Sequence, residues 1–134
     1  MKLKIYSDGG ARGNPGPAAI GFVIQNAQDN VIFKAGECIG HKTNNEAEYA
    51  AIIAALKKAK ELSGTELDCY LDSELVVKQL KGEYKVRNEK LAKCFLMVWS
   101  LQNQFKLVKY HHIYRERNKL ADSLVNEALD KKFL

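Results

Sequence analysis

The feature that most constrains this chain is the glycine-rich segment that follows its first apolar alternation. Leu3 and Ile5 alternate with polar or aromatic neighbours, which is the period-two pattern of a strand. Asp8 comes next, and glycines and prolines crowd the residues from there to Pro17. Because these residue types break helices and ladders, we expect the strand to end at Asp8 and to present its carboxylate at a sheet edge. An aspartate that serves only a hairpin turn explains this segment equally well.

Two β-branched runs, residues 18–25 and 31–40, follow with a polar turn between them. Together with the first strand they predict an antiparallel meander of three strands. A phosphate-cradling loop of a nucleotide-binding protein would open onto a helix, whereas these glycines open onto a strand. The pattern therefore argues against that class of site.

The rest of the chain predicts helices that alternate with two further strands. Helices are expected over 46–61, 75–80, 88–104 and 119–129, and strands over 67–71 and 105–113. This order predicts an α/β fold in which a mixed sheet is covered by helices on both faces. With 134 residues and no linker or low-complexity tract, residues 1–134 are expected to form a single domain.

Composition and charge limit the class of protein without identifying it. No apolar run reaches the roughly 20 residues of a membrane span, and the basic N-terminus lacks the apolar core of a signal peptide, so we expect a cytoplasmic protein. Cys38, Cys69 and Cys94 are widely spaced and odd in number, which predicts buried free thiols instead of disulfides or a zinc site. The net charge of +5 is compatible with a polyanionic partner but does not establish one.

The helix expected over 46–61 carries two acids near its start, Glu46 and Glu48. At roughly 3.6 residues per turn they point about 160° apart, so only one of them can face the sheet. Ile52 and Ala55 lie one and two turns beyond Glu48, whereas Glu46 stands in the first turn, where the helix dipole favours a solvated acid. Glu48 is therefore predicted to be the inward acid.

Four carboxylates lie at strand ends or helix starts and could converge at one edge of the sheet: Asp8, Glu48, Asp72 and Asp122. Four like charges so close together would raise one another's pKa strongly unless a cation neutralised them. Oxygen ligands without histidine or thiolate select Mg²⁺ or Mn²⁺ over zinc. Two such ions about 3.5 to 4 Å apart would activate water and stabilise the leaving oxygen of a phosphodiester. Taken singly, each acid is also explained as an exposed cap or turn residue.

Four segments, YSDGGARGNPGPAAIGF, TNNEAEYAAIIAAL, LDSELVVKQL and RNKLADSLVNEAL, resemble in this order the signature blocks of the type 1 ribonuclease H family. The resemblance implies a ribonuclease H-like fold with a five-stranded mixed sheet, three strands antiparallel and two further strands parallel. It implies cleavage of the RNA strand of RNA/DNA hybrids with 5′-phosphate and 3′-hydroxyl ends. The four acids would hold two Mg²⁺ ions, with Mn²⁺ as an alternative, and Glu48 would also position groups around the attacking water and the 2′-hydroxyl. We expect a monomer that needs no membrane and no small-molecule cofactor.

The resemblance also implies contacts with the hybrid, at Gly9, Gly10, Asn14, Thr43, Asn44 and Asn45. Short polar side chains and exposed backbone can read 2′-hydroxyls without base specificity. Thr43, Asn44 and Asn45 also supply candidate helix caps, and for the two asparagines capping and substrate binding are equally good interpretations.

The chain departs from well-known family members in three places. A loop histidine that many members carry is missing, and Arg115 occupies the shortened loop, where we expect it to contact phosphate, with a solvated arginine as the equal alternative. A basic protrusion is also missing, and the basic residues over 81–93 are interleaved with acids, so substrate binding should be weaker and salt-dependent. Glu46 and Glu74 stand where several relatives have arginine and glutamine, which could weaken binding of the DNA strand.

Two other functions share this fold. A non-catalytic or weakly active nucleic-acid-binding domain would be expected if an acid of the set were lost, but all four are present. DNA nucleases of the wider superfamily, such as integrases and resolvases, generally embed the core in longer chains and lack the TNNxAE helix start. Hybrid-specific cleavage is therefore the leading hypothesis.

Overall fold

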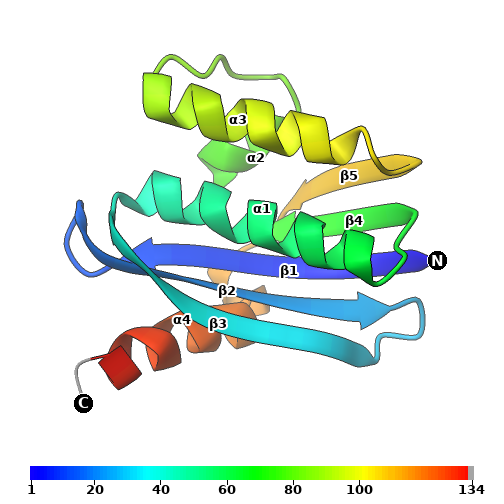
Figure 1. Ribbon diagram of the computed structural model, residues 1–134, viewed down its shortest axis with the longest axis horizontal. Coiled ribbons are helices and arrows are strands. Elements are labelled where there is room, and N and C mark those ends of the chain that lie inside the picture. The colour runs from blue at the N-terminus through cyan, green and yellow to red at the C-terminus, as the bar shows by residue number, and fades with distance from the viewer. Residues whose placement is uncertain (133–134) are drawn as a thin grey trace.

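The computed structural model describes residues 1–132, which form a five-stranded sheet between layers of helices (Figure 1). The elements are β1 (Lys2–Ala11), β2 (Gly16–Asn26), β3 (Val31–Lys42), α1 (Asn44–Glu61), β4 (Glu66–Leu71), α2 (Glu74–Leu80), α3 (Glu89–Gln102), β5 (Leu107–His112), the 3₁₀ turn η1 (Arg115–Arg117) and α4 (Lys119–Lys132). The sheet order is β3-β2-β1-β4-β5, antiparallel from β3 to β1 and parallel from β1 to β5. The α/β class and the mixed sheet predicted from the sequence are confirmed, and η1 is the one element over 1–132 that the sequence did not predict.

β1 continues past the point where the sequence predicts its end. It runs to Ala11, and residues 9–11 pair with residues 18–20 of β2. The prediction that the glycines interrupt the ladder is wrong, because the long antiparallel partner supplies hydrogen bonds whatever the side chains. The parallel pairing with β4 does stop at Ser7 and Leu71. Asp8 therefore lies inside β1 but just past the place where β1 and β4 separate.

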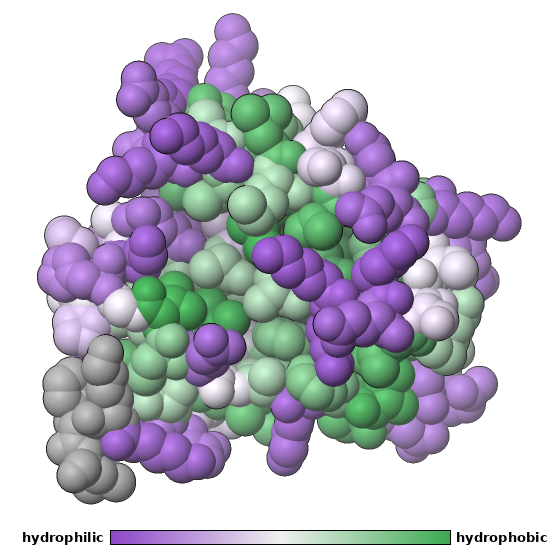
Figure 2. Space-filling view, in the orientation of Figure 1, coloured by the Kyte–Doolittle hydropathy of each residue, from purple (hydrophilic) through white to green (hydrophobic). Residues whose placement is uncertain are grey.

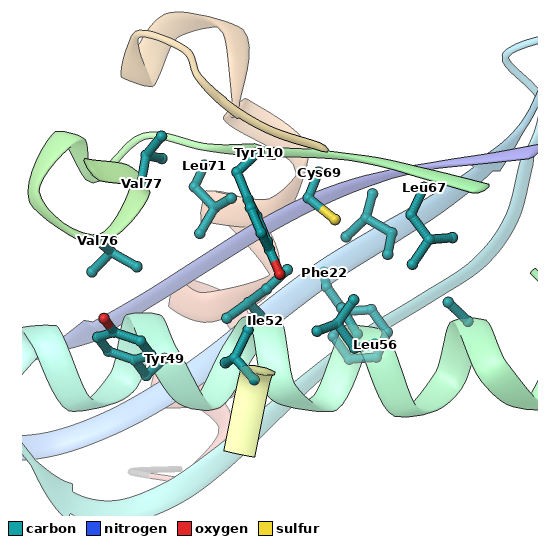
Figure 3. Packing of buried hydrophobic residues seen from close by; sticks show 14 of the residues in the cluster. Phe22, Tyr49, Ile52, Leu56, Leu67, Cys69, Leu71, Val76, Val77 and Tyr110 are labelled. Atoms are coloured by element: carbon teal, nitrogen blue, oxygen red, sulfur yellow. The ribbon is translucent and has the colours of Figure 1, made fainter. Parts of the chain in front are cut away.

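The main apolar cluster fills the space between the sheet and α1. Ile52 and Leu56 of α1 are fully buried in one cluster with Phe22, Leu71 and Tyr110 of the sheet (Figure 3). Burying an aliphatic side chain of this size contributes about 1.5 to 3 kcal/mol each. This packing holds α1, and with it Glu48, firmly against the strands.

α3 forms an outer layer beside α1 and is buried on one side only. Leu91 and Val98 are buried, whereas Leu96, Met97 and Trp99 are exposed. The space-filling view, in the orientation of Figure 1, shows apolar surface between long polar side chains (Figure 2). None of the helices within residues 1–132 is long and apolar enough to cross a bilayer.

The three cysteines are free thiols, as predicted. Cys69 is buried, but Cys38 and Cys94 are only half-buried, so the prediction of burial is wrong for these two. Cys38 lies on the edge strand β3 and Cys94 on the outer helix α3, where one side of each element faces solvent.

α4 packs on the opposite face of the sheet through a cross-strand pair of glycines. Gly21 of β2 pairs with Asp8 of β1 on one side and with Gly36 of β3 on the other. A Cβ at Gly21 would lie 2.4 Å from the carbonyl oxygen of Ala121, and a Cβ at Gly36 would lie 2.6 Å from another carbonyl oxygen of α4. Only glycine allows the α4 backbone to come this close. The close approach carries Asp122, in the first turn of α4, toward Asp8.

Replacing Gly21 with alanine is therefore expected to lower the free energy of unfolding by about 1 to 3 kcal/mol, because the added methyl group collides with the α4 backbone. Thermal unfolding followed by circular dichroism measures the loss. Gly10→Ala is the matched control, since its Cβ would lie 3.8 Å from the Val125 side chain, an ordinary contact. Equal melting temperatures for the two variants would contradict this mode of packing.

Candidate active site

A cleft of about 300 Å³ opens where β1 and β4 separate. All four predicted acids line it: Asp8, Glu48, Asp72 and Asp122. Asp8, Glu48 and Asp72 each place one carboxylate oxygen within 4.8 Å of the others. Asp122 lies on the same cleft but outside this group of three. The fold thus brings acids from β1, α1, the end of β4 and α4 to one place.

Glu48 reaches the cleft because α1 starts almost in contact with β1. A Cβ at Gly9 would lie 2.1 Å from the carbonyl oxygen of Ala47, so glycine is required there. The Gly9 N–H donates to Glu48 Oε1 at 3.2 Å, while Oε2 is buried and has no hydrogen-bond partner within residues 1–132. Glu46 instead accepts from the Thr43 N–H at 3.1 Å in a capping box. The prediction that Glu48 is the inward acid is confirmed.

Burial changes the acidity of two of the carboxyls. It raises the pKa of Asp8 to about 7, with further contributions from the charges of Asp72 and Asp122. The pKa of Glu48 lies well above its ordinary value, first because of burial and next because of the charge on Asp8. Ionised carboxylates buried this closely are unstable unless protons or a cation neutralise them.

The donor set fits a hard divalent cation. Every candidate ligand is a carboxylate oxygen, and histidine and cysteine are absent from the cleft lining. The unsatisfied Oε2 of Glu48 is an atom that a bound cation would satisfy. Such an oxygen-only set favours a hard cation over zinc.

Asp72 and Asp122 are each held by an asparagine that the sequence patterns did not single out. Asp72 Oδ2 accepts from Nδ2 of Asn118 at 3.0 Å. Asp122 Oδ2 accepts from Nδ2 of Asn126, one turn further along α4, at 3.4 Å. The signal for Asn126 is its spacing of four from Asp122 on one helix. Asn118 offers no comparable signal, because its partner is 46 residues away.

The residues predicted to bind the hybrid divide between two cavities. Five line the cleft with the acids: Gly9, Gly10, Asn44, Asn45 and Arg115. Asn14 and Thr43 line a separate cavity of about 540 Å³ together with Asn45, which borders both. The substrate surface predicted from the sequence is therefore two adjoining hollows joined at Asn45.

Asn44 is not a helix cap. The N-cap of α1 is Thr43, whose side chain accepts from the Glu46 N–H. Asn44 Oδ1 accepts from the Ala11 N–H at 2.8 Å, and the Asn44 N–H donates to Asn14 Oδ1 at 3.0 Å. Of the two interpretations left open by the sequence, capping is wrong for Asn44, because its side chain ties the end of β1 to the start of α1.

Comparison with known proteins identifies the family to which this fold belongs. Residues 6–128 match the family model described as reverse transcriptase-like. The chain is 43% identical over 131 residues to the bifunctional protein Rv2228c of Mycobacterium tuberculosis, covering 97% of this chain but 36%, about a third, of that relative. The crystal structure of RNase H1 from the archaeon Halobacterium salinarum superposes with a TM-score of 0.96 at 38% identity, covering 98% of this chain and 99% of the other.

A second solved structure was determined with nucleic acid bound. LC11-RNase H1 in complex with an RNA/DNA hybrid superposes with a TM-score of 0.94 at 41% identity, covering 98% of this chain and 99% of the other. The family model and the two RNase H1 structures each span nearly the whole chain. The chain therefore belongs to the ribonuclease H family, within the reverse-transcriptase-like group.

Proposed function

We propose that this chain is an endoribonuclease that cleaves the RNA strand of RNA/DNA hybrids and leaves 5′-phosphate and 3′-hydroxyl ends. The observation that carries the proposal is the meeting of Asp8, Glu48 and Asp72 within 4.8 Å, with Asp122 on the same cleft. The hybrid bound by LC11-RNase H1, which is 41% identical, supports a hybrid as the substrate.

Different residues of the chain would serve different roles in this reaction. Asp8, Glu48, Asp72 and Asp122 would hold two Mg²⁺ ions, or Mn²⁺ ions, which activate water and stabilise the leaving oxygen when bound. Glu48 is anchored through Oε1 by the Gly9 N–H at 3.2 Å, and its carboxylate would also position groups around the attacking water and the neighbouring 2′-hydroxyl. Gly9 and Gly10 line the cleft beside the acids, where their backbone would contact the RNA strand.

The decisive experiment incubates end-labelled RNA/DNA hybrid, RNA duplex and DNA duplex with Mg²⁺, Mn²⁺ or a chelator. We expect the RNA strand of the hybrid to be cut with either metal and not with the chelator. Phosphatase treatment of the products should remove a 5′-phosphate. Cleavage of the DNA duplex would favour a DNA nuclease of the same fold, and binding of the hybrid without cleavage would favour a non-catalytic nucleic-acid-binding domain.

Arg115 lines the acid cleft from the turn before α4, and we propose that it contacts a substrate phosphate. Arg115→Ala is expected to raise the KM for the hybrid about tenfold with a smaller change in kcat, since one charged contact is lost. The slope of log binding affinity against log salt concentration should also become shallower, by the amount that one phosphate contact contributes. Steady-state kinetics at two salt concentrations measures both effects.

Arg117→Ala is the matched control for this experiment. Arg117 lies in the same turn, but it lines a different cavity with Tyr6 and Gln25, away from the acids. Its loss changes the net charge equally and should leave KM near the wild-type value. Equal increases in KM for the two variants would refute a specific role for Arg115.

A further inference from the structure

Asn118 is a buried polar residue at the junction of η1 and α4. Its exposed fraction is 1%, although asparagine is usually found on the surface. Burying an amide is unfavourable unless its hydrogen bonds are made. Nδ2 donates to the Ser7 carbonyl oxygen at 2.9 Å and to Asp72 Oδ2 at 3.0 Å, so both amide hydrogens are used.

The orientation of this amide follows from the chemistry of its neighbours. A backbone carbonyl and an ionised carboxylate can only accept hydrogen bonds. The NH₂ group of Asn118 must therefore face Ser7 and Asp72, and its Oδ1, buried without a partner within residues 1–132, must face away. A flipped amide would place oxygen against two oxygens.

The backbone of Asn118 extends the same connection. Its carbonyl oxygen accepts from the Asp122 N–H at 3.1 Å, and its N–H donates to the Arg115 carbonyl oxygen at 2.9 Å. One buried residue thus joins the strand residue before Asp8, the carboxylate of Asp72, the first turn that carries Asp122 and the turn that carries Arg115.

We propose that Asn118 is a positioning residue of the acid cluster, which fixes Oδ2 of Asp72 and leaves Oδ1 available to a cation; this proposal rests on the proposed function. Asp72 is only half-buried, so packing alone does not fix its carboxylate beside Asp8 and Glu48, and the Asn118 amide supplies the directional contact. The amide holds it in place before any ion arrives. Hydrogen-bond partners of metal ligands typically contribute 10- to 100-fold in metal affinity.

Two substitutions separate hydrogen bonding from packing. Asn118→Ala removes both donors and most of the side-chain volume, whereas Asn118→Leu removes the donors but keeps a side chain of similar size. Leu67→Ala is the control for general loss of stability, because Leu67 is buried near the start of β4, remote from Asp72. All variants are studied below their melting temperatures, determined first by thermal unfolding.

The measurements are Mn²⁺ binding to the substrate-free protein by calorimetry and the Mg²⁺ concentration that gives half-maximal cleavage. For both Asn118 variants we expect Mn²⁺ affinity to fall and half-saturating Mg²⁺ to rise by about 10- to 100-fold. At saturating Mg²⁺, kcat should recover to within a few-fold of wild type and KM for the hybrid should stay unchanged. Leu67→Ala should change neither metal constant.

Wild-type metal constants in Asn118→Leu would overturn the proposal, because packing alone would then explain the residue. Unchanged metal constants in Asn118→Ala with a lowered melting temperature would overturn it as well. Failure of the proposed function gives a different result, in which the wild-type protein binds Mn²⁺ but cleaves no hybrid. The Mn²⁺ comparison then still decides the role of Asn118.

Discussion

Asp72→Asn is expected to abolish cleavage of an RNA/DNA hybrid, with kcat reduced by about a thousandfold or more. The change removes a carboxylate that we propose binds metal from the group of three acids within 4.8 Å. A loss of roughly 4 kcal/mol in transition-state stabilisation corresponds to this factor. An asparagine at this position can still accept the hydrogen bond from Asn118 through its amide oxygen, so the local geometry is preserved. Single-turnover cleavage of labelled hybrid in Mg²⁺ is the measurement.

Two further results test whether this loss is chemical or structural. Without divalent metal, the melting temperature of Asp72→Asn should equal or exceed that of the wild type, because like-charge repulsion is relieved. Asp68→Asn is the matched control on β4, the strand that ends just before Asp72. The Asp68 carboxylate lies 2.7 Å from His111 Nε2 and outside the acid cleft. Full cleavage by Asp72→Asn, or a marked fall in its melting temperature, would refute its assignment as a metal ligand.

The metal-free protein should lose stability as the pH rises from about 4 to about 7. Burial raises the pKa of Asp8 to about 7 in the folded state, whereas in the unfolded chain it returns to about 3.9. Between these values the folded state holds a proton that the unfolded state has released, so raising the pH favours unfolding. Below this window both states are protonated and above it both are ionised, so this contribution levels off. At about 1.4 kcal/mol per pKa unit, the change amounts to a few kcal/mol.

Urea unfolding at a series of pH values, with chelator and with Mg²⁺, measures this effect. Asp8→Asn should flatten the fall between pH 4 and 7, and the difference between variant and wild type reports Asp8 together with Glu48, whose pKa the charge on Asp8 raises. Mg²⁺ at pH 7 and above should restore stability to the wild type, because it binds only the folded state. An equal pH dependence in Asp8→Asn would show that another group is responsible.

The sequence predicts much of this fold because its signals are local. Apolar periodicity locates the strands and helices, and the 100° rotation per helical residue is sufficient to choose Glu48 over Glu46 as the inward acid. The continuation of β1 through Gly9 and Gly10 depends instead on the ladder that β2 provides. Local preferences for turns do not contain that information.

In the candidate site, too, local sequence patterns predict some features, whereas others depend on residues far apart in the chain. The four acids were predicted as one set, and they line one cleft, although the metal-binding role of each stays a prediction. The sequence does not predict a role for Asn118, because its side-chain hydrogen bond is to Ser7, 111 residues away. The turn that places it is predicted only as a loop. The placement of Asn14 and Thr43 in a neighbouring cavity likewise depends on how α3 packs beside α1.

α4 completes the acid cleft, yet it takes no part in the main apolar cluster of the described chain. That cluster is built from the sheet and the other three helices, whereas α4 contributes Val125 and Leu129 to a small separate cluster over the glycines. Because α4 contributes no side chain to the main cluster within residues 1–132, it can open at a lower free energy than the scaffold unfolds. Such a subglobal opening would withdraw Asp122 and loosen Asn118 while the strands stay paired. On warming, catalytic competence should therefore disappear at a lower temperature than the sheet itself, and amide hydrogen exchange should find α4 the less protected part.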